Sequence, residues 1–296
     1  MLLHCCNGGQ MKLLVLGATG LIGYAVFQTL SQCKDFKITG TVRSEGQKSA
    51  FDISIQAQLL SGIDVANESF LTEVFERVKP DQVINCIGYT KHQPDNLKAY
   101  MALNSALPHR LLNLCNQLNS RLIHISTDCV FSGKTGNYRE SDIPDAEDAY
   151  GKSKILGEIF DGNSITLRTS TIGHELFSNH GLLNWFLAQH DSCEGYRNAI
   201  FSGLPTPVFA EIIRDLVIPN SQLRGLYHVS AAPISKFDLL TLIADIYRKK
   251  IQIKANDEIK INRSLNCQKF SDSTGFNPLS WNSLINYMQS SYQKSA

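Results

Sequence analysis

Two side chains that could deliver a proton to a carbonyl oxygen stand four residues apart in this sequence. Of the ten tyrosines, only Tyr150 is followed four residues later by a lysine, Lys154. On a helix, this spacing places both side chains on one face. A free phenol has a pKa of about 10, which is too high for easy proton exchange at neutral pH, and we expect the Lys154 ammonium to lower it. The pair therefore predicts a proton donor for the reduction of a carbonyl.

A hydroxyl that could orient this carbonyl ends an expected strand at 121–126, where the chain reads Ser126-Thr127-Asp128. The Thr127 hydroxyl can hydrogen-bond the substrate oxygen and turn it toward Tyr150. A tyrosine and a lysine at this spacing are, by themselves, typical of an amphipathic surface helix. The catalytic interpretation therefore depends on this hydroxyl and on a nearby source of hydride.

That source is predicted by a glycine-rich turn at residues 17–23, which reads Gly-Ala-Thr-Gly-Leu-Ile-Gly between an apolar run and a helical segment. Gly17 permits a tight turn, Gly20 lets the backbone approach a pyrophosphate, and Gly23 allows close packing of helix on strand. We expect a nicotinamide dinucleotide here. The predicted contacts are Gly17, Thr19, Gly20, Leu21, Ile22 and Gly23.

The end of the second expected strand indicates which dinucleotide is bound. An acidic residue there would bind the ribose 2′-hydroxyl of NAD, whereas this chain has Thr41-Val42-Arg43-Ser44. Arg43, aided by Ser44, could pair with the 2′-phosphate of NADP. NADPH is therefore the expected cofactor and NADH the alternative. A solvated surface arginine is the other interpretation of Arg43.

Apolar runs alternate with helical patterns along the first part of the chain, as in consecutive βαβ units. This predicts an α/β fold, a Rossmann doubly wound parallel sheet over 11–170. A smaller C-terminal α/β substrate-binding region is expected over 171–296, with some elements returning to the Rossmann core. Residues 1–10 are expected to form a flexible extension. The expected strands are 12–17, 37–42, a short segment ending at 63–64, 82–87, 121–126 and 164–169.

The composition argues against several other classes of protein. Twenty-eight basic and 27 acidic residues give a net charge of +1, so neither nucleic acid nor an anionic membrane is an expected partner. No apolar run approaches the roughly 20 residues of a membrane span, and the first ten residues do not resemble a signal peptide. We therefore expect a cytoplasmic protein. The eight cysteines include no CxxC pair, so buried thiols are expected and no metal site.

Several longer motifs make the chain similar to the extended short-chain dehydrogenases/reductases, and more narrowly to the dTDP-4-dehydrorhamnose reductase group. The similarity covers most of the chain from about residue 12. It implies a catalytic set at Thr127, Tyr150 and Lys154 and a nucleotide-linked sugar as substrate. The motifs are GATGLIG at 17–23, STDCVFSG at 126–133, Tyr138-Arg139-Glu140, YGKSKILGE at 150–158, LRTS at 167–170, Gly203-Leu204-Pro205-Thr206, GLYHVS at 225–230 and Arg263-Ser264-Leu265-Asn266.

The resemblance also implies further contacts with the cofactor at the ends of later strands. It places Asp64 and Val65 beside the adenine, a segment after the fourth strand beneath the ribose, and Thr169 near the nicotinamide. Asn104 matches a position where the family uses an asparagine to shape the site, and a polar residue in a helix is the equally weighted alternative. The segment beneath the ribose is Cys86, Ile87 and Gly88.

The chain departs from the family pattern in two places. Cys129 stands where the family usually has a tyrosine, which would reshape the pocket. The segment 171–203 does not resemble that of the rhamnose enzyme, so the sugar could differ. Four side chains could contact the sugar or its nucleotide, although a core or surface role is the more common one for each. These are His174, His180, Trp185 and Arg197.

The leading hypothesis is NADPH-dependent reduction of the C4 ketone of a nucleotide-linked 6-deoxy sugar, in the synthesis of surface polysaccharide precursors. No metal is needed for this chemistry, and a homodimer is the candidate assembly. An epimerase that retains NAD is one alternative. A dehydratase is disfavoured because Cys129, not a second carboxylate, follows Asp128. A non-catalytic NADP-binding chain is the third possibility, because the regulatory subunit of methionine adenosyltransferase resembles the same group.

Overall fold

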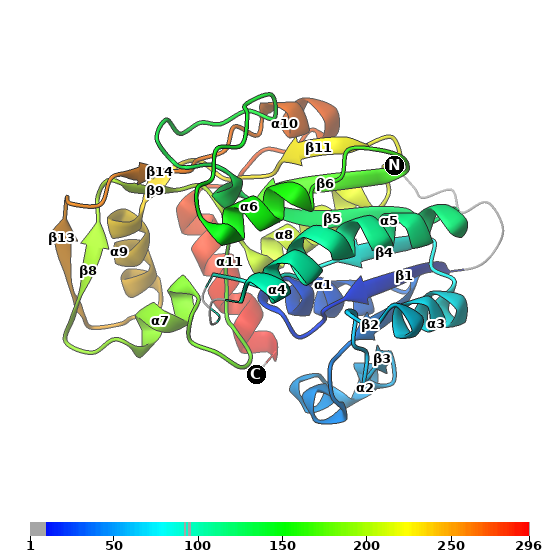
Figure 1. The fold of residues 1–296 in the computed structure, drawn as a ribbon. Helices are drawn as coiled ribbons and strands as arrows, with labels where there is room; N and C mark the ends of the chain where they lie inside the picture. The colour runs from blue at the N-terminus through cyan, green and yellow to red at the C-terminus, as the bar shows by residue number, and fades with distance from the viewer. Residues whose placement is uncertain (1–9, 92, 94–95, 296) are drawn as a thin grey trace.

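A parallel sheet of seven strands forms the centre of the protein in a computed structural model that describes residues 10–91, 93 and 96–295 (Figure 1). The strand order is β11-β6-β5-β4-β1-β2-β3, and every neighbouring pair is parallel. The predicted Rossmann-type fold is confirmed. The strands are β1 (Met11–Leu16), β2 (Phe36–Thr41), β3 (Leu59–Leu60), β4 (Gln82–Asn85), β5 (Arg121–Thr127), β6 (Ser164–Thr169) and β11 (Gly225–His228).

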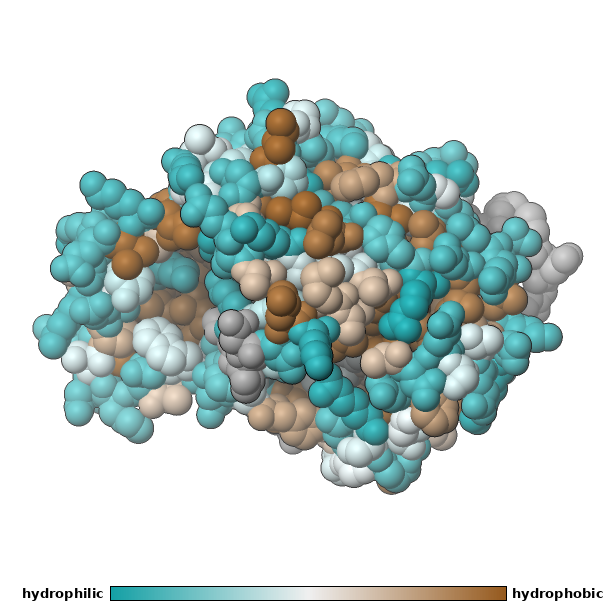
Figure 2. All heavy atoms as spheres, in the orientation of Figure 1, coloured by the Kyte–Doolittle hydropathy of each residue, from teal (hydrophilic) through white to brown (hydrophobic). Residues whose placement is uncertain are grey.

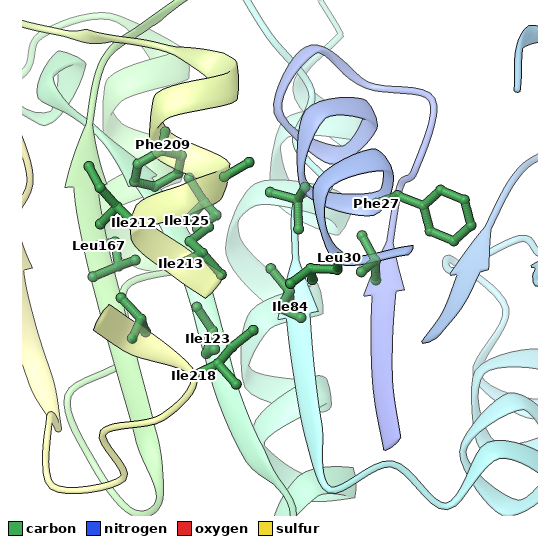
Figure 3. Packing of buried hydrophobic residues seen from close by; sticks show 14 of the residues in the cluster. Phe27, Leu30, Ile84, Ile123, Ile125, Leu167, Phe209, Ile212, Ile213 and Ile218 are labelled. Carbon is green, nitrogen blue, oxygen red and sulfur yellow. The ribbon is translucent and has the colours of Figure 1, made fainter. Parts of the chain in front are cut away.

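The strands are apolar runs because helices cover both faces of the sheet. One face packs against α1 (Leu21–Ser31), α8 (Thr206–Ile212) and the π-helical turn η4 (Ile213–Val217), with Phe27 and Phe209 fully buried (Figure 3). The other face packs against two more helices. Consecutive residues of β1 alternate between these two cores, as the two-residue repeat of a strand requires. The two helices on this second face are α3 (Glu68–Val78) and α5 (Leu107–Gln117).

The helical segment over residues 97–117 is interrupted in the structure. A short helix, α4 (Leu97–Ala99), leads into the π-helical turn η2 (Tyr100–Ala106), and α5 follows. This turn packs very closely against Gly157. A Cβ atom on Gly157 would lie 1.8 Å from the Asn104 carbonyl oxygen. Such turns frequently occur at functional sites.

Most of the elements beyond residue 170 build a C-terminal lobe beside the sheet, drawn at the left of Figure 1. Its core includes Leu183, Phe186, Leu239 and Leu240. Figure 2 shows apolar side chains in the recess between this lobe and the body of the molecule. The lobe contains β7 (Thr171–Ile172), β8 (Ser192–Tyr196), β9 (Ala199–Phe201), β10 (Leu204–Pro205), β12 (Ile234–Ser235), β13 (Gln252–Asn256), β14 (Ile261–Asn262), α7 (Leu182–Ala188), α9 (Lys236–Ile246) and α11 (Trp281–Ser295), while α10 (Gln268–Thr274) packs against β11.

Two elements from beyond residue 170, α8 and β11, belong to the central core. The division into 11–170 and 171–296 stays a prediction, and the expected extension at 1–10 lies almost wholly outside the described residues. Within the described part of the chain, no helix has the length and apolarity required to cross a membrane.

Candidate active site

The glycine turn at 17–23 follows β1 and is tied to the end of β2. Gly17 has a φ of +79°, which favours glycine. Its N–H donates to Thr41 Oγ1 (3.1 Å), and the Ala18 N–H donates to the Thr41 carbonyl (3.0 Å). A Cβ atom on Gly23 would lie 2.0 Å from the Gly17 carbonyl oxygen. The turn therefore requires glycine at both positions, as the sequence predicted.

The N-terminus of α1 suits the pyrophosphate of a dinucleotide. Its N-cap is the exposed Gly20, which offers no side chain to the N–H groups of the first turn, and that turn has no acidic residue. Free N–H groups and the helix dipole both favour an anion. The turn lies between β4 and β2, where the strand order reverses, which is where doubly wound folds bind ligands. Thr19, Leu21 and Ile22 are partly exposed here.

The predicted adenosine contacts follow β2 and β3. Arg43 and Ser44 are exposed, and both of their N–H groups donate to Gln47 Oε1, at 2.9 and 3.3 Å. Within the described residues the Arg43 guanidinium forms no salt bridge, so it is available to a phosphate. Asp64 is exposed and accepts a local hydrogen bond from the Ala66 N–H (3.0 Å). Val65 follows it and is partly exposed.

The predicted contacts after β4 lie against the glycine turn. The Cys86 N–H donates to the Leu16 carbonyl (3.1 Å), and the Ile87 side chain would meet a Cβ atom on Gly17 at 2.8 Å. Gly88 is exposed. Thr169 ends β6 at the same edge of the sheet and is buried. The structure therefore brings the carboxyl ends of β1, β2, β4, β5 and β6 to one edge.

Thr127, Tyr150 and Lys154 meet at this edge. Helix α6 (Ala149–Leu156) begins where Asp148 accepts a hydrogen bond from the Gly151 N–H (2.8 Å). The Tyr150 phenol lies near the Thr127 side chain at the end of β5, close enough for Thr127 to influence its pKa. Lys154 is buried, and its Nζ donates to the carbonyl of Ile125 (2.8 Å). A phenol, a hydroxyl and an amine therefore lie close together at the edge of the sheet that also carries the glycine turn.

The expected effect of Lys154 on the phenol is wrong for this structure. Burial raises the pKa of Tyr150, the neighbouring acidic groups of Cys129 and Asp128 raise it further, and the Thr127 side chain lowers it. The largest causes of this shift do not include Lys154, whose Nζ donates to the Ile125 carbonyl. Burial also lowers the pKa of Lys154 itself to about 8. The phenol is therefore fully protonated at neutral pH.

Asn104 connects the loop after β4 to the catalytic helix. It is fully buried in η2, where Oδ1 accepts from the Tyr89 N–H (2.8 Å) and Nδ2 donates to the Tyr89 carbonyl (2.9 Å) and to Ser153 Oγ (2.9 Å). Ser153 neighbours Lys154 on α6. The Asn104 amide therefore positions α6. Neither of its partners, Tyr89 and Ser153, was identified from the sequence.

Positive side chains surround Cys129, next to the catalytic threonine. Lys91 Nζ lies 3.9 Å and an Arg263 terminal nitrogen 3.8 Å from Cys129 Sγ. Burial raises the pKa of the neighbouring Asp128, although Arg263 and Lys91 act to lower it. Sequence analysis missed Lys91, and it recorded Arg263 only as part of a family motif.

The four side chains considered as sugar contacts have other surroundings. The His174 ring stacks on Tyr292 (3.7 Å between centroids), and Nε2 lies 3.0 Å from the Tyr247 hydroxyl. Arg197 forms an exposed salt bridge with Asp257 (3.4 Å). His174 and Arg197 therefore have structural partners. The other two, His180 and Trp185, are exposed to solvent.

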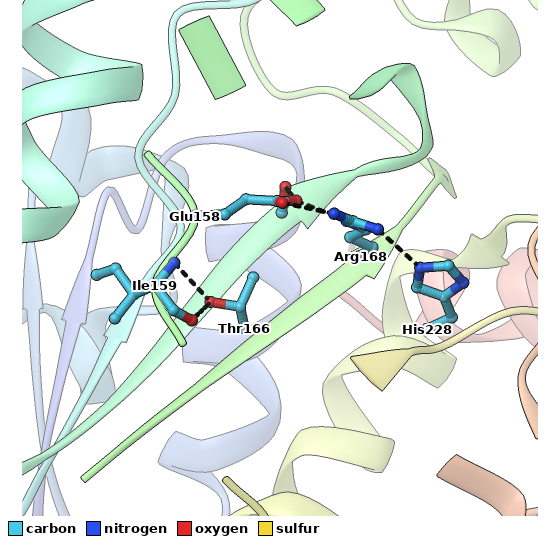
Figure 4. Close-up of polar contacts among 6 residues, drawn as sticks. Glu158, Ile159, Thr166, Arg168 and His228 are labelled. Carbon is cyan, nitrogen blue, oxygen red and sulfur yellow. Dashed lines mark hydrogen bonds and ion pairs between the residues drawn. The ribbon is translucent and has the colours of Figure 1, made fainter. Parts of the chain in front are cut away.

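A buried polar network packs against the end of β5 that carries Thr127 (Figure 4). Arg168 Nε and a terminal nitrogen each donate to Glu158 at 2.7 Å, and Ser126 Oγ donates to Glu158 Oε1 at 2.7 Å. The second terminal nitrogen of Arg168 lies 3.2 Å from His228 Nε2. The network connects β5, β6, β11 and the chain after α6. It fixes the side chain of Ser126, the residue before Thr127.

Stability should fall in mild acid because the fold holds two buried histidines neutral. Burial lowers the pKa of His228 to about 3 and that of His124 well below 6.5. His228 Nδ1 donates to the Tyr138 carbonyl (3.0 Å), so Nε2 is left as an acceptor facing Arg168. The unfolded chain binds protons as the pH falls through about 6.5, and the folded chain does not. Each histidine should therefore cost about 2 kcal/mol of unfolding free energy by about pH 5.

Urea unfolding between about pH 7.5 and pH 5 measures this loss. A free energy of unfolding that stays constant over that range contradicts the assignment of neutral histidines. His228→Gln should reduce the pH dependence, because it removes one of the two groups.

Comparison with known proteins agrees with this geometry. The family model described as the RmlD substrate binding domain matches residues 11–293. The chain belongs to this family. The dTDP-4-dehydrorhamnose reductase of Aggregatibacter actinomycetemcomitans is 27% identical over 247 residues, which are 79% of this chain and 78% of that protein. The resemblance inferred from the motifs is confirmed.

Two solved structures share the fold. The dTDP-4-dehydrorhamnose reductase (rfbD) of Bacillus anthracis in complex with NADP has a TM-score of 0.78 at 21% identity, and covers 95% of this chain and 99% of its own. The Bordetella bronchiseptica enzyme WbmG in complex with NAD and UDP also has a TM-score of 0.78, at 18% identity, and covers 97% and 96%.

Proposed function

We propose that this chain is an NADPH-dependent reductase that reduces the 4-keto group of a nucleotide-linked 6-deoxy sugar in the synthesis of surface polysaccharide precursors. The observation that carries the proposal is the meeting of Thr127, Tyr150 and Lys154 beside the glycine turn. The reductase relative and the NADP and UDP complexes of the two similar structures support it. We also propose a homodimer as the assembly and the cytoplasm as the location.

Each of the three residues has a separate task in this reaction. The dinucleotide, when bound, supplies the hydride to the carbonyl carbon. Tyr150 gives its phenolic proton to the oxygen that gains negative charge, and its raised pKa ensures that the proton is present at neutral pH. The Thr127 hydroxyl hydrogen-bonds the same oxygen and orients it. Lys154, whose Nζ donates to the Ile125 carbonyl, would bind ribose hydroxyls of the cofactor.

The residue after Asp128 argues against dehydration. Loss of water from the sugar needs a second acid-base group here, and this chain offers the thiol of Cys129. Burial raises the pKa of that thiol to about 11, so it neither donates nor accepts a proton readily at neutral pH. Reduction needs no such group, because Tyr150 supplies the only proton.

Arg43 should determine the choice between NADPH and NADH. Arg43→Ala removes the charge that we assign to the 2′-phosphate, so the KM for NADPH should rise about 10- to 100-fold. The KM for NADH should change little. Steady-state kinetics with both cofactors tests this. Arg224→Ala is the matched control, because Arg224 is an exposed arginine just before β11, at the opposite edge of the sheet. Equal KM values for NADPH in wild type and Arg43→Ala contradict the assignment.

A panel of dTDP-, UDP- and GDP-linked 4-keto sugars tests the substrate class through NADPH oxidation. Turnover of at least one of them, with a reduced 6-deoxy sugar as product, is expected. Purified protein that carries stoichiometric NAD⁺ and interconverts sugars without consuming NADPH would indicate an epimerase instead.

A further inference from the structure

Three cationic side chains from separate parts of the chain converge beside the catalytic threonine. Lys91 follows β4, Lys236 begins α9 and Arg263 follows β14. Lys91 and Arg263 approach Cys129 Sγ to 3.9 and 3.8 Å. Lys236 lies close enough that its pKa responds to Lys91, Asp128, Cys129 and Arg263. We call Lys91, Lys236 and Arg263 the cationic cluster.

The cationic cluster carries more positive charge than its surroundings balance. Within the described part of the chain, none of its three members forms a salt bridge. Asp128 is a carboxylate that acts on Lys236, and its own pKa is raised by burial. The Cys129 thiol is neutral, with a pKa of about 11. Gathering like charges costs free energy unless an anion joins them.

The geometry of the cationic cluster leaves donors available. Arg263 Nε donates to the Phe131 carbonyl (2.8 Å), and one of its terminal nitrogens faces Cys129. Such a planar fork matches the oxygens of a carboxylate or phosphate.

The cationic cluster is also next to the reacting carbonyl. The Cys129 N–H donates to Thr127 Oγ1 (3.1 Å), which is the hydroxyl that orients the ketone. Cys129 and Asp128 both influence the pKa of Tyr150. An anion bound at the cationic cluster would therefore lie within about the width of a sugar ring from the carbon that is reduced.

We propose that Lys91, Lys236 and Arg263 form a binding subsite for an oxyanion of the substrate, a phosphate or a carboxylate, and so select the sugar nucleotide that is reduced. This inference rests on the proposed function, since it places the oxyanion on the same substrate. The two sources are the diphosphate that links sugar to nucleotide and a carboxylate at C6 of the sugar, which would make the substrate a uronic acid in place of the 6-deoxy sugar of the proposed function.

Calorimetric titration of the NADP⁺-loaded protein with UDP, UDP-glucose and UDP-glucuronic acid tests the subsite without turnover. Lys91→Met and Arg263→Met are the test variants, and Lys260→Met, an exposed lysine just before β14, is the matched control. Lys91 is exposed, so Lys91→Met should fold normally even where Arg263→Met fails to fold.

If the diphosphate occupies the subsite, both variants should bind all three ligands about 10-fold or more weakly. If a sugar carboxylate occupies it, only the affinity for UDP-glucuronic acid should fall. Wild-type affinity for all three ligands in Lys91→Met and in folded Arg263→Met overturns the proposal. Loss of binding in these variants, together with no turnover of any keto sugar by the wild type, upholds the subsite and rejects the reductase.

Discussion

Replacing Tyr150 with phenylalanine is expected to lower kcat for the keto sugar by about 10²- to 10⁴-fold, because it removes the group that protonates the oxygen of the product. The phenylalanine ring retains most of the packing, and the glycine turn is untouched. The affinity for NADPH should therefore stay within about twofold of wild type. Stopped-flow or steady-state kinetics, with NADPH binding followed by fluorescence, measures both quantities.

Tyr287→Phe is the matched control for this variant. Its hydroxyl also makes a hydrogen bond, to Glu211, but it lies on α11 and has no place in the catalytic set. Its kcat should equal that of wild type. Full activity in Tyr150→Phe would assign the proton to another group. It would also favour the non-catalytic alternative if the wild type turned over none of the keto sugars.

Replacing Arg168 with methionine should lower the free energy of unfolding by about 3–5 kcal/mol, because it leaves a buried carboxylate without its cation. Arg168 and Glu158 have side chains only 2% and 1% exposed, so solvent does not compensate. The loss should also move Ser126, and with it the end of β5 that carries Thr127. Urea unfolding of the variant, with kcat measured on the folded fraction, tests both consequences.

The double variant Arg168→Met/Glu158→Gln separates the buried charge from the lost packing. Glutamine keeps an acceptor for Ser126 and removes the unpaired charge, so it should recover much of the lost stability. A double variant no more stable than Arg168→Met would mean that the carboxylate is not the cause. A loss below about 1 kcal/mol in the single variant would contradict the ion pair itself.

The parts of the site that local sequence determines could be predicted. The glycine turn is set by backbone conformation and close packing at Gly17 and Gly23, and both requirements are visible as residue types. The pairing of Tyr150 with Lys154 follows from the repeat of a helix. The strands were found because burial on both faces makes them continuous apolar runs.

The parts that depend on tertiary packing could not be predicted. Lys154 was expected to act on Tyr150, but the direction of its ammonium is set by the Ile125 carbonyl, on a strand 29 residues earlier in the chain. The π-helical turn that holds Asn104 has no local signal in the sequence. The cationic cluster joins segments more than 100 residues apart, and no spacing rule connects them.

The transfer of hydride to the sugar is tested most directly with NADPH that carries deuterium at the transferred position. After incubation with a nucleotide-linked 4-keto-6-deoxy sugar, NMR of the product should show deuterium on C4, with one NADP⁺ formed for each sugar reduced. The same experiment with Tyr150→Phe should give almost no labelled product. A sugar converted without label on C4, or without consumption of NADPH, would contradict the account.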